Sequence, residues 1–157
     1  MDFICLTMLC TYVTIIYAVC DDITANSKFT VVDRRIMNRF EYEKFITEKY
    51  NVKSEYLWES APSFAVYRHK LNRKWFAVVM RIGKSKIGID EPGEIDIVNL
   101  KCPPEIMFDI QHEQGIYPAY HMNKKHWCTV LLDGSVEDAG LEWLTENSYI
   151  ATLKKNK

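Results

Sequence analysis

The sequence predicts one α+β domain over residues 37–157, with a mostly antiparallel sheet and helices packed on one face. Several short runs alternate apolar and polar residues and are rich in β-branched and aromatic side chains, as strands are. Short turns join these runs, which favours antiparallel pairing, and segments with helical periodicity stand at both ends of the region. With 157 residues, of which 48% are hydrophobic and 26% charged, the chain is long enough for one substantial core.

The domain is expected to open with a helix. Asn38 is a suitable N-cap, the helix runs to about Tyr50, and Asn51 can end it. Its apolar side chains are expected to form one buried stripe, which consists of Phe40, Phe45, Ile46 and Tyr50.

Three strands are expected to follow this helix. Residues 64–69 alternate like a strand, and residues 70–74 (KLNRK) are typical of a hairpin turn. Residues 75–82 (WFAVVMRI) are the clearest strand in the chain, because they are rich in β-branched and aromatic side chains. Residues 95–100 (IDIVNL) alternate again and predict another strand.

The second half predicts two helices around one more strand. Pro103 or Pro104 suits the first turn of a helix that runs to about Gln114, with Gly115 as its end. A strand over residues 127–132 and a turn at Asp133–Gly134 come next. A final helix covers about residues 136–153, and its apolar stripe comprises Leu141, Leu144, Tyr149 and Ile150.

Residues 1–36 differ in composition and are interpreted as an apolar leader outside this domain. Residues 3–20 carry no charge, and a stretch of about eighteen such residues reaches the lower limit for a membrane span. Three interpretations stay open: a membrane anchor, a signal peptide, or an upstream stretch read from a misplaced start before Met37. Asp2 and the lack of Lys or Arg before the apolar run argue against the signal peptide. We expect a cytoplasmic protein, with anchoring through residues 3–20 as the alternative.

The charge balance excludes a polycationic protein. The formal net charge is -1, and residues 37–157 contain equal numbers of basic and acidic side chains, so any nucleic-acid affinity requires uneven charge placement. The cysteines show no CxxC spacing, which argues against a zinc site. Cys102 and Cys128 lie in apolar runs and are expected to be buried thiols.

The stretch His121–Trp127 (HMNKKHW) gathers two histidines, an asparagine, two lysines and a tryptophan. Such a cluster is costly to bury, so it is expected on the surface at the entrance of a strand. Lys124 and Lys125 could contact phosphates, and Asn123 could hydrogen-bond a base edge or shape the turn. Trp127 could stack on a base, although its place in an alternating strand favours packing in the core.

A second basic group lies on the predicted hairpin turn and comprises Arg68, Lys70, Arg73 and Lys74. A basic β-ribbon can lie along a nucleic-acid groove. The alternative is a solvated hairpin whose charges discourage edge-to-edge pairing of strands. The first interpretation requires this turn and the two lysines Lys124 and Lys125 to share one surface.

Candidate residues for catalysis or metal binding are few. His121 and His126 stand in an irregular segment without a carboxylate at helical spacing, so no metal site is predicted. His126 and Cys128 could form a nucleophile pair on one strand face, but no third residue is evident to orient them. Because the sequence contains no Gly-rich phosphate loop, serine elbow or paired acid–base motif, we predict neither an enzyme activity nor a cofactor.

Three motifs resemble the MmcQ/YjbR family of small bacterial proteins: KCPPE (101–105), GIYPAYHMNKKHW (115–127) and LLDGSV (131–136). SEYLWESAPSFAVYRH and KWFAVVMRI resemble that family's N-terminal half, so the resemblance spans roughly Met37 to Lys155. It implies a CyaY-like, or frataxin-like, α+β fold and the family's usual description as DNA-binding proteins. The fold also raises iron binding by analogy, but the expected first helix mixes acidic and basic residues, which weakens that analogy.

We therefore expect a small non-enzymatic DNA-binding protein whose contacts with the DNA backbone are mainly electrostatic. The candidate binding residues are Arg68, Lys70, Arg73, Lys74, His121, Asn123, Lys124, Lys125, His126 and Trp127. The alternative is a protein- or small-ligand-binding module that uses the surface of residues 121–127 and has no DNA role. A membrane is a partner only if residues 1–36 are retained, and the sequence indicates no oligomeric state.

Overall fold

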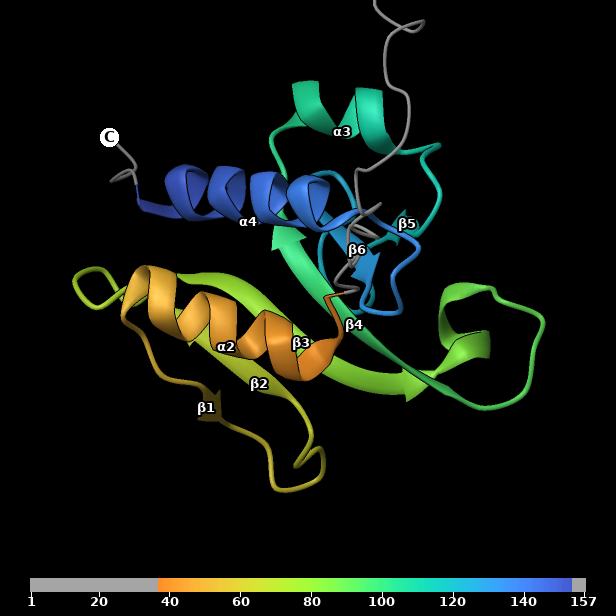
Figure 1. Cartoon of the computed structure of the whole chain (residues 1–157), viewed down its shortest axis with the longest axis horizontal. Coiled ribbons are helices and arrows are strands. Elements are labelled where there is room, and N and C mark those ends of the chain that lie inside the picture. Colours follow the sequence, from red (N-terminus) through yellow and green to blue (C-terminus); the bar gives the residue numbers. More distant parts are fainter. Residues whose placement is uncertain (1–36, 154–157) are drawn as a thin grey trace, which may run out of the picture. The chain divides into compact units, whose positions relative to one another are not determined.

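The computed structural model describes residues 37–153, which form a six-stranded sheet and three α-helices (Figure 1). In chain order the elements are α2 (Arg39–Tyr50), β1 (Glu55–Tyr56), β2 (Ala65–Arg68), β3 (Trp75–Gly83), the 3-10 helix η1 (Lys84–Ile87), β4 (Glu94–Lys101), α3 (Pro104–Ile110), β5 (Ile116–Pro118), β6 (Trp127–Leu131) and α4 (Asp138–Leu153). The predicted α+β class is confirmed, and the short strands β1 and β5 are additions to the predicted element order.

All neighbouring strands pair antiparallel, in the order β1-β2-β3-β4-β6-β5. In the long central pair, Ala77 of β3 lies opposite Leu100 of β4. Lys101 of β4 lies opposite Trp127 of β6. This register puts the start of β3, the end of β4 and the start of β6 at one end of the sheet, beside the β2–β3 turn (residues 69–74).

One face of the sheet, which we call the helix face, carries the larger apolar cluster. Alternate strand residues such as Val79, Val98 and Val130 point to this side and are fully buried. Side chains from α2, α3 and α4 pack against the same cluster, so the three α-helices of the described region share this face (Figure 1). The predicted packing of helices on one face is confirmed.

The α2 helix begins and ends where the sequence predicts. The Asn38 side chain accepts a hydrogen bond from the Glu41 N–H at 3.2 Å, and the Glu41 carboxylate accepts one from the Asn38 N–H at 3.1 Å. Asn51 ends the helix in the left-handed conformation, at φ 51°. The predicted apolar stripe is wrong at Phe40, which is 77% exposed, because Tyr42 faces the sheet instead.

The α4 helix turns small polar residues as well as leucines toward the sheet. Leu141 and Leu144 are buried as predicted, whereas Ile150 is 47% exposed, contrary to the prediction. The buried stripe continues instead through three hydroxyl residues, Thr145, Ser148 and Thr152. Each hydroxyl has a hydrogen-bond partner, so it can be buried without leaving a polar group unsatisfied.

The α3 helix begins at Pro104 as predicted but ends at Ile110, earlier than the expected Gln114. Residues 111–114 are polar and exposed, so they offer the core no apolar side chain that would hold another helical turn. The chain turns back through Gly115, whose φ of 79° suits a glycine, and enters β5.

The opposite face of the sheet, which we call the loop face, also buries apolar side chains. Its cluster consists of Val66, Val78, Met80, Ile82, Ile95, Ile97 and Leu131. Within the described residues no α-helix packs against this cluster; the covering side chains come from the β1–β2 loop (residues 57–64), the segment around η1, and the segment around β5. The two faces of the sheet are therefore closed by different kinds of structure.

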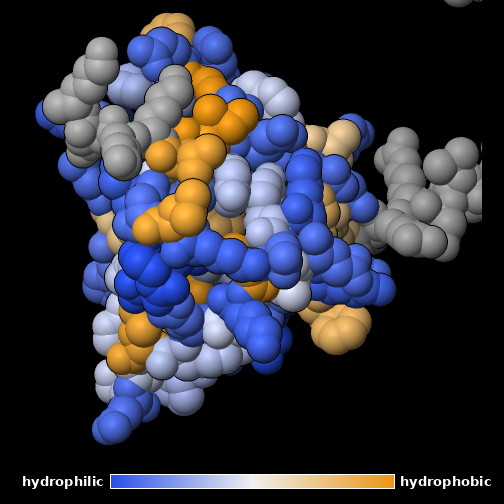
Figure 2. Space-filling model, turned by 90° about the vertical axis from the view of Figure 1, so that its left-hand side faces the viewer, coloured by the Kyte–Doolittle hydropathy of each residue, from blue (hydrophilic) through white to orange (hydrophobic). Residues whose placement is uncertain are grey.

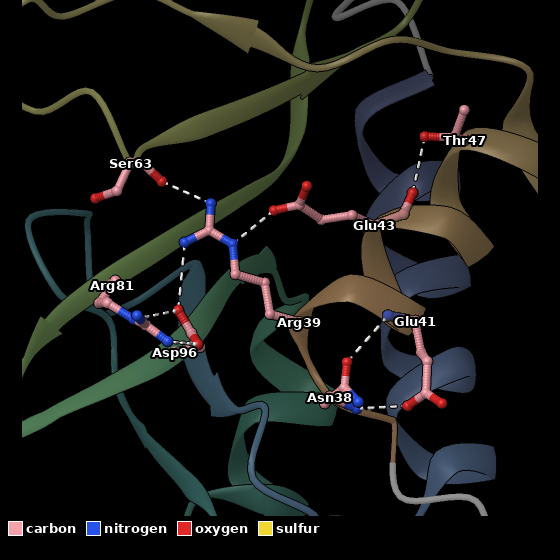
Figure 3. Close-up of polar contacts among 8 residues, drawn as sticks. All are labelled: Asn38, Arg39, Glu41, Glu43, Thr47, Ser63, Arg81 and Asp96. Atoms are coloured by element: carbon pink, nitrogen blue, oxygen red, sulfur yellow. Dashed lines mark hydrogen bonds and ion pairs between the residues drawn. The ribbon is translucent and has the colours of Figure 1, made fainter.

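A network of ion pairs ties the start of α2 to the sheet and to the β1–β2 loop (Figure 3). Arg39 contacts Glu43 at 2.7 Å and Asp96 at 3.3 Å, and it donates a hydrogen bond to the Ser63 carbonyl at 2.7 Å. Arg81 binds the same Asp96 carboxylate at 2.7 Å. Since Ser63 belongs to the β1–β2 loop, the network fixes one end of a loop that covers the loop face.

The predicted leader, residues 1–36, lies outside the described residues, so its boundary and its three interpretations stay predictions. Between residues 37 and 153 no helix combines the length and the apolarity that a membrane crossing requires. Cys102 and Cys128 are buried free thiols, as predicted. Their mutual hydrogen bond and burial raise the pKa of Cys128, which opposes its use as the nucleophile of a pair with His126.

Candidate functional site

The sheet register brings the two basic stretches of the sequence to the same end of the domain. Arg68 at the end of β2 pairs with Trp75 at the start of β3, and Lys101 at the end of β4 pairs with Trp127 at the start of β6. The β2–β3 turn and the β5–β6 loop therefore project from one end of the sheet. This basic end comprises residues 68–75, Lys101 and residues 119–127.

The arginines at this end already have a carboxylate partner. Glu55 of β1 holds both of them, because Arg68 Nε lies 3.2 Å from one carboxylate oxygen and Arg73 Nη2 lies 2.5 Å from the other. The Arg68 guanidinium also lies over the Trp75 ring, 5.3 Å from its centroid. The free positive charge of the turn is therefore smaller than the sequence suggested, because strand β1 brings Glu55 beside it.

The β2–β3 turn is fastened to the end of α4. His69 Nε2 lies 2.8 Å from Thr152 Oγ1, and Asn72 Nδ2 donates a hydrogen bond to the Thr152 carbonyl at 2.9 Å. Lys70 and Leu71, at the tip of the turn, are exposed. Figure 2 looks onto the side of the domain where this turn and the end of α4 lie, and it shows a mostly hydrophilic surface crossed by a band of hydrophobic side chains.

The β5–β6 loop (residues 119–126) owes its shape to two local features. His121 has a φ of 54°, a left-handed conformation that is uncommon for a residue with a side chain. The Asn123 side chain accepts a hydrogen bond from the Lys125 N–H at 3.0 Å, so it shapes the turn, which was one of its two predicted roles. The other basic side chains predicted here are exposed: Lys124, Lys125 and His126.

A hollow of about 320 Å³, which we call the sheet-end pocket, lies between the two basic stretches. Its lining includes Lys74, Trp75, Lys101 and Trp127. Lys101 Nζ lies 5.7 Å from the centroid of the Trp127 ring, within the range of a cation–π contact. Trp127 is partly exposed and belongs to neither apolar cluster of the described region, so it is not the core residue that strand alternation favoured.

A second hollow of about 420 Å³, the loop-face pocket, opens beside it. The β1–β2 loop supplies one wall through Trp58, the β5–β6 loop supplies another through Tyr120 and His121, and the sheet supplies the floor. Trp75 lines both hollows, so they are neighbours, and Ala151 and Thr152 of α4 complete the sheet-end pocket from the helix side.

Aromatic rings give the loop-face pocket its shape. The Trp58 ring stands at 86° to the Trp75 ring, with 5.7 Å between the ring centroids, and at 80° to the Phe64 ring. On the opposite wall the centroids of the Tyr120 and His121 rings lie 4.1 Å apart. The pocket can therefore present both ring faces and ring edges to a planar ligand.

Asn99 is a buried polar residue on the floor of this pocket. Its Nδ2 donates to the Tyr120 carbonyl at 2.6 Å, and its Oδ1 accepts from Thr129 Oγ1 at 2.6 Å. Thr129 Oγ1 in turn accepts from the Tyr120 N–H at 3.0 Å. These three hydrogen bonds fix the orientation of the Asn99 amide and tie the β5–β6 loop to the sheet.

Carboxylates are few in the segments around the two pockets: Glu59 stands beside Trp58, and Glu55 pairs with the two arginines of the basic end. Residues 60–89 and residues 114–132 contain no Asp or Glu. By contrast, a hollow of about 560 Å³ beside α2 on the helix side is lined by more carboxylates than cations. The carboxylates are Glu41, Glu48, Asp138 and Glu142, and the cations are Lys44 and Lys49. An anionic ligand therefore finds a more favourable potential at the basic end than beside α2. Among the described residues no three His, Cys, Asp or Glu side chains gather as a metal site would require.

Sequence reasoning singled out the lysines of the basic end but missed the pocket between its loops. Trp58, Trp75 and Lys101 fall in stretches that resemble the family, but nothing in those stretches, or around Asn99, marks these residues as functional. The signal that could have found this region is the pair of long carboxylate-free segments, since both of them fold onto one part of the sheet.

Two sequence comparisons agree on one family. The sequence profile described as YjbR matches residues 47–151. The Bacillus subtilis protein YyaQ is 38% identical over 117 residues, which cover 74% of this chain and 99% of that protein. The Escherichia coli protein YjbR is 42% identical over 53 residues, which cover 33% of this chain and 45% of that protein.

Solved structures agree with the sequence comparisons. A crystal structure of a Pseudomonas syringae protein has a TM-score of 0.72 at 42% identity and covers 74% of this chain and 99% of that chain. A crystal structure of a Deinococcus radiodurans protein, described as a DUF419 domain, has a TM-score of 0.58 at 26% identity and covers 76% of this chain and 81% of that chain. The names of these relatives state no activity, so function has to be argued from the site. With the predicted motifs, the sequence match and the fold in agreement, the chain belongs to the YjbR family.

Proposed function

We propose that this protein binds DNA through the basic end of its sheet and acts by binding alone, without catalysis, in the cytoplasm. The observation that carries the proposal is the strand register, which gathers the β2–β3 turn, the end of β4 and the β5–β6 loop at one end of the domain. The lysines that stand there come from three separate segments and are Lys70, Lys101, Lys124 and Lys125.

Phosphate contacts by these lysines supply most of the affinity. Lys124 and Lys125 are exposed and form no ion pair with another described residue, so their charges are available to an anionic backbone. Each lysine that neutralises a phosphate releases a condensed counterion, which makes the affinity fall as salt rises. Arg68 and Arg73 contribute less, because Glu55 already neutralises part of their charge.

A second candidate function is the binding of a small ligand without DNA. The loop-face pocket favours it, since its volume of about 420 Å³ lies within the range of small-molecule sites, about 300–1,000 Å³. The aromatic rings that line this pocket surround the buried Asn99 amide and would suit a compact aromatic ligand.

Fluorescence anisotropy with a labelled DNA oligonucleotide and the full-length protein tests the first proposal. We expect an affinity that falls steeply between about 50 mM and about 200 mM salt. The double variant Lys124→Ala/Lys125→Ala should weaken binding and reduce the slope of log affinity against log salt by about 1 per lysine. The matched control is Lys44→Ala/Lys86→Ala, which removes the same charge from exposed positions on α2 and η1 and should leave both quantities unchanged.

Undetectable binding, or binding that ignores salt, would contradict the DNA proposal and favour the small-ligand function. Equal losses of DNA affinity in the double variant and its control would mean that binding depends on the net charge of the protein and not on the basic end.

A further inference from the structure

We propose that the loop-face pocket receives one unpaired base, so that the protein prefers single-stranded DNA to duplex DNA. The inference rests on the proposed DNA-binding function and assigns it a specific site. Lysines of the basic end hold the phosphates, and the pocket beside them takes a base from the same strand.

The walls of the pocket suit a planar heterocycle. Trp58 is 37% exposed and stands edge-on to Trp75, so an incoming ring can stack on one indole while it meets the edge of the other. Tyr120 and His121 close the opposite side. Stacking of bases on such side chains is the usual source of affinity for single strands and tolerates any base, because every base has a π-face.

The floor supplies the polar group that a base edge requires. The Asn99 amide carries two N–H donors and two acceptor positions, and its hydrogen bonds to Tyr120 and Thr129 use one of each. One donor and one acceptor position remain on this fully buried amide at the pocket floor, and a base edge carries the same pair of groups. A purely apolar ligand would leave the remaining donor and acceptor of the Asn99 amide without a partner.

The arrangement of charge and pocket selects a strand with accessible bases. A paired base has its edge occupied and both faces stacked, so it reaches a recessed pocket only after it leaves the helix. Tyr120 and His121 lie on the same loop as Lys124 and Lys125. A base between the pocket walls therefore brings its neighbouring phosphates toward exposed lysines.

A peptide fits this place less well. Added strands pair with the edges of a sheet, which are β1 and β5 here, whereas the pocket lies over the inner strands β3 and β4. Residues 60–89 and 114–132 contain no carboxylate, and Glu59 is the one carboxylate of the β1–β2 loop, so the surroundings of the pocket favour an anionic partner as well.

The test compares labelled oligothymidine with a labelled duplex of the same length, using the full-length protein. Trp58→Ala removes one wall, and Ala61→Phe adds a ring inside the pocket without changing any charge. We expect each variant to lower the affinity for oligothymidine about tenfold and to change duplex affinity less than about twofold. Trp143→Ala is the matched control, because Trp143 is a comparably exposed tryptophan on α4, outside this pocket. Unfolding midpoints of all three variants verify that they fold.

The outcomes separate this inference from the function on which it rests. If the pocket variants weaken both DNA forms equally, or neither, the base pocket is overturned while lysine-dependent DNA binding stands. If wild-type protein binds neither form, the DNA function fails. A titration with thymidine monophosphate, followed by tryptophan fluorescence, then tests whether the pocket binds a nucleotide. Quenching of tryptophan fluorescence that is lost in Ala61→Phe supports a nucleotide site, whereas no quenching by the wild type overturns it.

Discussion

Both faces of the sheet bury apolar side chains, but within residues 37–153 α-helices cover only one of them. On the helix face, α4 adds hydrogen bonds to apolar packing: Ser148 Oγ donates to the Phe76 carbonyl and accepts from the Lys101 N–H. On the loop face, irregular segments cover a smaller apolar cluster and leave a pocket over β3 and β4. A helix presents a continuous stripe of side chains to a sheet, whereas loops touch it at separate points and leave gaps between them.

We expect this difference between the faces to separate residues that act on stability from residues that act on binding. The Ser148 hydroxyl on the helix face is fully used by internal partners, so it holds α4 in place. The Asn99 amide on the loop face retains unused hydrogen-bonding capacity, and the β5–β6 loop to which it is bonded carries exposed lysines. We therefore expect substitutions on the helix face to act mainly on stability, and substitutions on the loop face to act mainly on binding.

The largest effect is expected from a core aromatic on the helix face. Phe76 is fully buried and packs against the rings of Tyr50, His69 and Tyr149. Phe76→Ala should lower the free energy of unfolding by about 3–5 kcal/mol, because it leaves a cavity in a rigid cluster. In urea unfolding, the loop-face variant Trp58→Ala should lose only about 1 kcal/mol, roughly the value of its aromatic contacts. Similar losses of unfolding free energy in the two variants would contradict the proposal that the helix face carries most of the stability.

A smaller effect is expected from one hydroxyl that joins α4 to two strands. Ser148→Ala removes the partner of the Lys101 N–H and of the Phe76 carbonyl, and each buried group left unpaired costs about 1–3 kcal/mol. Urea unfolding measures the loss, and hydrogen exchange of the Lys101 amide should become faster. Ser60→Ala, at an exposed position on the loop face, should change stability by less than about 0.5 kcal/mol. An unchanged Lys101 exchange rate would show that the hydroxyl does not connect these elements.

A third prediction concerns backbone strain on the loop face. His121 adopts φ 54°, which glycine tolerates and a β-branched residue does not. His121→Val should be less stable than His121→Gly by about 1–2 kcal/mol, measured by thermal or urea unfolding. Both variants lose the ring that lines the pocket and should bind oligothymidine more weakly than wild type. Equal stability of the two variants would indicate that the loop relaxes when its side chain changes.

The smallest effect is expected from a buried histidine where the β2–β3 turn meets α4. His69 is almost fully buried, and Nδ1 has no hydrogen-bond partner among the described residues. Burial lowers the pKa of His69 below its ordinary value of 6.5, and the nearby charge of Lys74 adds to this shift. The unfolded chain therefore binds a proton more readily, so the stability contribution is complete above about pH 6.5 and is lost as the pH falls below it.

Unfolding free energies measured for wild type and His69→Gln between neutral and mildly acidic pH check this prediction. Glutamine retains a side-chain N–H that can reach Thr152 but cannot gain a proton, so the variant should lose stability less steeply on acidification. Parallel pH curves for the two proteins would assign the acid sensitivity to other groups.

The sequence predicted elements well where the signal is local. The Asn38 cap and the alternating run of β3 depend on near neighbours in the chain, and both are where they were predicted. The prediction of buried side chains failed on α2, where apolar residues stand on two sides of the helix. Phe40 is more apolar than Tyr42, yet Tyr42 is the buried residue, and its hydroxyl meets Thr145 on α4. Only the packing of two helices decides such a choice.

The candidate site shows the same division. The surface position of Lys124 and Lys125 could be predicted, because two adjacent lysines in an irregular segment are expensive to bury. The pairing of Glu55 with both arginines of the β2–β3 turn could not, since it depends on a two-residue strand too short to leave a pattern. The pocket was also out of reach, because its walls come from loops about 60 residues apart in the chain.

The sequence by itself determined the α+β class, the order of the main helices and strands, and the exposure of the lysines before β6. These features follow from periodicity, capping and desolvation, which act over a few residues. The tertiary structure alone decided that two basic stretches share one end of the sheet, that Glu55 neutralises part of their charge, and that a pocket opens on the loop face. The physical reason is the antiparallel register, because one set of strand pairings fixes the distance between residues that the chain itself keeps far apart.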